Sequence, residues 1–196
     1  MAINYQQYRD AQIKSGALFQ DFVTEICASH ANLIIQIYSS KEFQWNIGES
    51  RQGIEIKFDD KFATTGNLWI EIAEKARPRD GDYAISGIYR SDNTWLYLIG
   101  NYDTIFIFPK NILQMLHSAE RYKVLENNLK TSKGFLLPRA DAERYACLIL
   151  TPQATEKVAR FVKDTVGLAK ELRKLLDADV RQNSLFPRKE EMEISR

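Results

Sequence analysis

Apolar and polar residues alternate strictly in two stretches in the first half of the chain. In GIEIKFD the apolar side chains fall on one face, and Glu55, Lys57 and Asp59 fall on the other. The later stretch NLWIEIAEK repeats the pattern, with Glu71 on its more polar face. Since successive side chains of a strand point to opposite faces, each stretch predicts a half-buried strand. The intervening DDKFATTG is rich in turn formers, which favours antiparallel pairing of the two strands.

Three further stretches have helical spacing. Residues 17–31 place apolar side chains three and four positions apart, which predicts an amphipathic helix beginning near Ser15. KNILQMLHSAER follows Pro109 and predicts a second helix. After Pro152, an apolar stripe over residues 153–178 predicts a long C-terminal helix.

The remaining apolar runs predict short strands. They are LIIQIYSS, residues 42–46, NTWLYLIG, TIFIFP and CLIL, with a helical turn over residues 85–91 and a short helix within LLPRADAERYACLIL. This order predicts an α/β protein with a mixed central β-sheet flanked by helices and a long C-terminal helix. We expect residues 1–150 to form the core, and residues 151–196 to form the C-terminal helix and a polar tail.

Composition narrows the class of protein without giving its function. The length of 196 residues suits one domain with an appendage, and a formal net charge of +1 neither favours nor excludes DNA binding. Cys27 and Cys147 lack metal-binding spacing, so we expect both to pack in the core. The polar N-terminus and the absence of a long apolar run predict a cytoplasmic protein with no membrane association.

The charged strand face is the candidate site for chemistry. A carboxylate two positions from a lysine places an oxygen ligand and an ammonium group side by side. Hard oxygen ligands suit Mg²⁺, for which Mn²⁺ can substitute, and Mg²⁺ commonly binds one or two carboxylates together with phosphate oxygens. Beside such an ion, lysine can position or deprotonate a water, or stabilise charge on a phosphoryl group. Glu55 and Lys57 therefore predict phosphodiester hydrolysis.

The run G-I-E-I-K-F-D resembles the E-x-K half of the PD-(D/E)XK nuclease superfamily, which includes restriction endonucleases, Holliday-junction resolvases and phage nucleases. The resemblance extends over about Ser15 to Leu116, through TGNLWIE, SGIYRSDNTWLYLIG and TIFIFPKNIL. It implies a restriction-endonuclease-like fold and Mg²⁺-dependent cleavage of DNA, with Glu55 as a metal ligand and Lys57 as the catalytic lysine.

The chain departs from the superfamily in the acid that precedes E-x-K. No Pro-Asp pair occurs upstream, so another carboxylate has to complete the metal site. Glu49 is the first candidate and Glu71 the second, with Glu42 and Glu25 as further alternatives. We therefore expect a metal site of Glu55 with Glu49 or Glu71, although E-x-K alone also occurs on ordinary exposed strands.

DNA contacts are expected outside the catalytic strand. Lys130, Lys133, Arg139 and Arg144 gather around TSKGFLLPRADAER, where they can contact phosphates or simply face solvent. Restriction-type cleavage of both strands requires two active sites, which predicts a homodimer, with the C-terminal helix as a plausible interface. The alternatives are a junction resolvase or phage nuclease, and a non-catalytic DNA-binding module of the same fold.

Overall fold

The computed structural model describes residues 5–151. Along the chain the elements are α1 (Tyr5–Ala31), α2 (Lys41–Asn46), β1 (Ile54–Phe58), α3 (Phe62–Thr65), β2 (Asn67–Glu74), β3 (Ala84–Ile85), the 3₁₀ turn η1 (Gly87–Tyr89), β4 (Leu96–Gly100), β5 (Ile105–Pro109), α4 (Lys110–Ser118), β6 (Val124–Glu126), β7 (Ser132–Pro138), α5 (Arg139–Tyr145) and β8 (Leu148–Leu150). The predicted C-terminal helix, and with it the expected dimer contact, lies outside the described residues.

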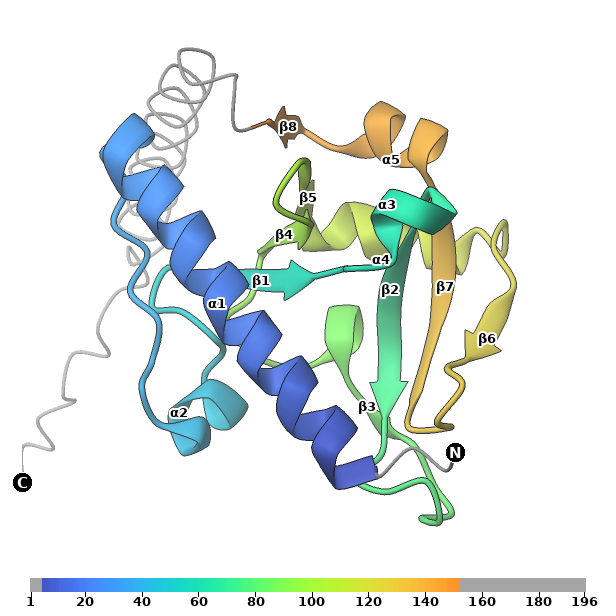
Figure 1. The fold of residues 1–196 in the computed structure, drawn as a ribbon. Helices are drawn as coiled ribbons and strands as arrows, with labels where there is room; N and C mark the ends of the chain where they lie inside the picture. The colour runs from blue at the N-terminus through green and yellow to red at the C-terminus, as the bar shows by residue number, and fades with distance from the viewer. Residues whose placement is uncertain (1–4, 152–196) are drawn as a thin grey trace, which may run out of the picture.

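The strands form two four-stranded sheets (Figure 1). The first has the order β1-β4-β5-β8; β1 runs parallel to β4, and the other pairs are antiparallel, so this sheet is mixed. The second has the order β3-β2-β7-β6 and is antiparallel throughout. The α/β class is confirmed, but the expected single central sheet is in fact two sheets.

The first sheet is buried on both faces, because its strands send alternate side chains into two hydrophobic clusters. On β4, Leu96 and Leu98 pack in the cluster that includes Phe19 and Val23 of α1. The intervening Tyr97 packs in the second cluster, which also includes residues of β2, β7 and α4. The first sheet is therefore enclosed between α1 on one side and the second sheet with α4 on the other.

The predicted antiparallel pairing of GIEIKFD with NLWIEIAEK is wrong. β1 pairs with β4, and β2 pairs with β7 and β3. The short helix α3 follows β1 and ends at Gly66, whose left-handed backbone (φ 66°) lets the chain turn into β2 of the other sheet. A linker rich in turn formers thus carries the chain between sheets instead of closing a hairpin.

Other local predictions have mixed outcomes. The strands in NTWLYLIG, TIFIFP and CLIL, the helix after Pro109, the short helix before CLIL and a turn within residues 85–91 are all confirmed. Residues 42–46 lie in α2, a helix whose first turn is capped by Ser40, so the predicted strand is wrong. LIIQIYSS forms only a bridge between Ile37 and Ser50. The first helix begins ten residues earlier than predicted.

Two simpler expectations are also resolved. Cys27 is buried in the first cluster as predicted, but Cys147 is exposed, because it lies between α5 and β8. No helix within residues 5–151 combines the length and apolar character that crossing a bilayer requires.

Candidate active site

Strand β1 places Glu55 and Lys57 on the face that looks toward the second sheet. The alternate residues Ile54 and Ile56 pack in the cluster under α1, so Glu55 and Lys57 point to the opposite face of the strand. Glu55 is only 1% exposed. A buried carboxylate requires charged or hydrogen-bonding partners, and those partners define the site.

Glu55 has three such partners. The Lys57 ammonium nitrogen lies 2.6 Å from its Oε1. Thr94 donates a hydrogen bond of 3.3 Å to Oε2, and a guanidinium nitrogen of Arg90 lies 3.7 Å from the same oxygen. Burial raises the pKa of Glu55, but Lys57 and then Arg90 outweigh it, and the net pKa lies below the ordinary value. Glu55 is therefore ionised at neutral pH.

Arg90 is held in turn by a buried carboxylate. Its Nε lies 2.6 Å from Oδ2 of Asp92, and the Lys110 ammonium lies 3.1 Å from Oδ1. Burial raises the pKa of Asp92, but hydrogen bonds from Arg90, the Thr94 amide and Lys110 lower it further than burial raises it. Sequence reasoning missed this group. Its only signal in the sequence was the charged turn YRSDNT, one residue ahead of β4.

Glu49 reaches the same strand from the loop before it. Its Oε1 accepts a hydrogen bond of 2.8 Å from the Ile56 amide, and the residue is 9% exposed. Ser50 closes this loop by bonding both the amide and the carbonyl of Ile54. Burial raises the pKa of Glu49 to about 7, and Lys57 opposes this rise. The separation of six positions between Glu49 and Glu55 is thus enough to bring both acids to β1.

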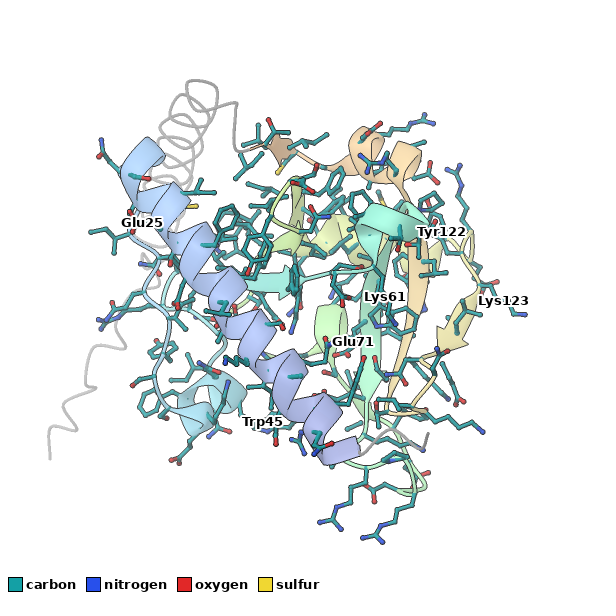
Figure 2. All side chains as sticks on the ribbon, viewed as in Figure 1. Glu25, Trp45, Lys61, Glu71, Tyr122 and Lys123 are labelled. Carbon is teal, nitrogen blue, oxygen red and sulfur yellow. The ribbon has the colours of Figure 1, made fainter. Side chains whose placement is uncertain are left out.

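Glu71 approaches from the second sheet. Ser86 donates to its Oε1 at 3.0 Å, and Ser132 donates to its Oε2 at 2.7 Å. Burial raises the pKa of Glu71, partly offset by Lys57 and the two serines. Both carboxylate oxygens are thus occupied by hydrogen bonds from the protein. Figure 2 shows Glu71 between α1 and β2.

Lys57 interacts electrostatically with all three acids, Glu55, Glu49 and Glu71. Desolvation of its ammonium group lowers its pKa, but Glu55, Glu49 and Glu71 together raise it well above the ordinary value. The Lys57 side chain is therefore protonated at any physiological pH. In this state it positions groups and stabilises negative charge, and it is not poised to take a proton from water.

Lys57 also separates two hollows in the surface. One, of about 250 Å³, is lined by Lys41, Gln44, Trp45, Glu49, Glu55, Lys57 and Arg90. The other, of about 480 Å³, extends from Lys57 along β2 and includes Glu71, Trp69 and Tyr8. The site is thus open to a ligand from two sides, although the side chain of Glu55 itself is buried.

The other acidic candidates lie elsewhere. Glu42 and Glu25 are exposed, and Figure 2 shows Glu25 far along α1 from Glu71. Asp59 accepts hydrogen bonds from the backbone amides of Lys61, Phe62 and Trp69. It therefore stabilises the turn after β1, as its sequence position suggests.

The fit to a metal ion rests on two carboxylates. Among the described residues, no group of three His, Cys, Asp or Glu side chains is arranged to hold a metal. Glu49 and Glu55 line one hollow together. Mg²⁺ needs only one or two carboxylates when waters and phosphate oxygens complete its shell. The donor set therefore fits Mg²⁺ and does not fit a structural zinc site.

The four basic residues predicted to contact DNA do not join this site. Lys133 lies 4.0 Å from Glu126 and over the Tyr83 ring, and Arg139 lies over the Phe62 ring. Lys130 and Arg144 are exposed. None of the four lines either hollow beside Lys57. Contact of these residues with DNA stays a prediction.

Comparisons with known proteins leave the identity of the chain open. No protein-family model, no curated protein and no solved structure matches it. Functional inference therefore depends on the site itself.

Proposed function

We propose that the protein is a Mg²⁺-dependent DNA endonuclease of the PD-(D/E)XK type. The observation that carries the proposal is the convergence of Glu49, Glu55 and Lys57 at one hollow, with the lysine 2.6 Å from Glu55. E-x-K on an exposed strand would be an ordinary surface pair, but here Glu55 is 1% exposed. A protein that buries a carboxylate spends stability on it, which is typical of a functional site.

In the proposed mechanism, Glu49 and Glu55 would hold the cation, which supplies Lewis acidity for the hydrolytic water and the scissile phosphoryl oxygen. The Lys57 ammonium stabilises the negative charge that develops on the phosphate in the transition state. Arg90, fixed by Asp92, orients Glu55 and limits its repulsion with the substrate. Glu71, from the opposite sheet, adds to the negative charge around the Lys57 ammonium, and it is a positioning residue because its two oxygens already accept hydrogen bonds.

A non-catalytic DNA-binding module is the second candidate. It is favoured by the ion pair between Lys57 and Glu55, which has to open or rearrange before Glu55 can bind a cation with that oxygen. A plasmid-cleavage assay with the purified full-length chain and Mg²⁺ separates the two candidates. We expect wild type to cleave, and Glu55→Gln, Glu49→Gln and Lys57→Ala each to lose about 100-fold or more of the rate.

Glu25→Gln and Glu42→Gln are matched controls, since each removes an exposed carboxylate that sequence reasoning also considered. We expect both to keep the wild-type rate within about two-fold. Binding without cleavage of plasmid, flap or junction DNA by wild type would establish the non-catalytic module. Equal rates for Glu55→Gln and wild type would contradict the assigned site.

A further inference from the structure

The indole of Trp69 lies where two hollows meet. The first is the 480 Å³ hollow that contains Lys57. The second, of about 580 Å³, lies on the side toward α2. Both are lined by Tyr8, Trp69, Glu71 and Asn127, so they form one cleft. We define the Trp69 cleft as these two hollows together. Trp45, which is 61% exposed, links the cleft to the hollow of Glu49 and Glu55.

The Trp69 ring is held rigidly in this cleft. Its Nε1 donates to Ser132 at 3.3 Å, and the same serine donates to Glu71. Beneath it, Gly134 of β7 leaves room for the ring: a Cβ on this glycine would lie 2.8 Å from two ring carbons. The indole is therefore preorganised as a flat platform, and its position is coupled to that of the acid beside Lys57.

The charges of the Trp69 cleft do not suit a DNA duplex. Duplex binding depends on clustered cations that neutralise several phosphates. Here four cations, Arg9, Lys57, Lys61 and Lys75, are offset by acids that line the same cleft, namely Asp59, Asp60, Glu71, Glu74 and Glu126. What the cleft does offer is aromatic rings and the amide side chains of Gln12 and Asn128.

Single-strand sites combine aromatic platforms with cations along the backbone; every base has a face that stacks, whereas the faces inside a duplex are covered. In the Trp69 cleft the indole provides the platform, and Lys57 provides a cation in the same hollow. We propose that the Trp69 cleft binds an unpaired DNA strand, with one base stacked on Trp69 and the adjoining phosphate directed toward Lys57. This assignment rests on the proposed nuclease function for the identity of the polymer. It makes single-stranded, flap or junction DNA the substrate class, in place of the duplex expected from the sequence.

Fluorescence anisotropy tests the assignment with labelled oligothymidylate of about 12 nucleotides, a length within the usual site size. The full-length protein is titrated in EDTA, so that binding is measured without hydrolysis. We expect tighter binding to this oligonucleotide than to a duplex of the same length. Trp69→Ala should weaken single-strand binding about ten-fold or more, and Trp69→Phe, which retains a ring, should weaken it less.

Trp95→Ala is the matched control, because Trp95 is 46% exposed and lines neither the Trp69 cleft nor the hollow of Glu55. It should bind oligothymidylate like wild type. Preference for the duplex, or equal binding by folded Trp69→Phe, Trp69→Ala and wild type, would overturn the assignment. If those variants bind equally while wild type cleaves DNA, only the cleft assignment fails. If Trp69-dependent binding occurs and no DNA form is cleaved, only the nuclease proposal fails.

Discussion

At the scale of single residues, protonation of the buried Glu49 carboxyl group makes the stability of the folded protein depend on pH. Burial raises its pKa from an ordinary 4.5 to about 7. The folded protein thus holds this proton more tightly than the unfolded chain does. The stabilisation is fully present below pH 4.5 and is lost as the pH rises through 7, where both states are ionised. At about 1.4 kcal/mol per pKa unit, the loss is on the order of 3 kcal/mol.

We therefore expect the metal-free wild type to lose stability between about pH 5 and pH 8. Glu49→Gln should remove most of this dependence, since an amide does not titrate. Urea unfolding in EDTA across this range measures both slopes. The variant also controls for Glu71, whose raised pKa acts in the same direction. An unchanged slope in Glu49→Gln would assign the dependence to other groups.

Sequence alone pointed to the acids of the candidate site, but not to the residues around them. Alternation of apolar and polar residues predicted that Glu55 and Lys57 share one face of a strand, and proximity along the chain favoured Glu49. Arg90 and Asp92 could not be predicted, because they reach Glu55 only through the parallel pairing of β1 with β4. Sequence also left open whether E-x-K lies in solvent or between sheets, since the pattern of one strand does not reveal what covers its polar face.

At the scale of elements, the pairing of β2 with β7 supports the site from the second sheet. Sequence reasoning missed this pairing, because residues 75–131 lie between the two strands along the chain and because alternation carries no information about which strands pair. Gly134 makes the pairing possible beside Trp69. A Cβ there would lie 2.4 Å from the Ile70 carbonyl oxygen as well as against the indole.

We expect Gly134→Ala to lower the free energy of unfolding by about 1 to 3 kcal/mol, through overpacking against backbone and ring. Gly16→Ala is the matched control: Gly16 lies within α1, and nothing lies within 4 Å of its added Cβ. That change should be stabilising by about 0.5 to 1 kcal/mol, since alanine favours the helix. Urea unfolding measures both. Equal effects of the two substitutions would show that space beside Trp69 is not limiting.

At the scale of the whole molecule, strands β4 and β5 join the two hydrophobic clusters. Ile105 and Ile107 pack in the cluster under α1, whereas Phe106 and Phe108 pack in the cluster against the second sheet. Neither cluster can open without exposing one face of the strands that they share. The site lies between the sheets, so it depends on both clusters being intact.

We therefore expect residues 5–151 to unfold in one cooperative transition. Cys27 reports on the first cluster by its thiol reactivity, in a Cys147→Ser background that removes the exposed thiol. Trp69 reports on the second sheet by its fluorescence, once Trp45 and Trp95 are replaced by phenylalanine. The two midpoints in urea should coincide. Val23→Ala, made in α1, should shift both by the same amount, corresponding to about 2 kcal/mol. If Cys27 reacts at urea concentrations where Trp69 emission is still native, α1 separates first and the two clusters are independent folding units.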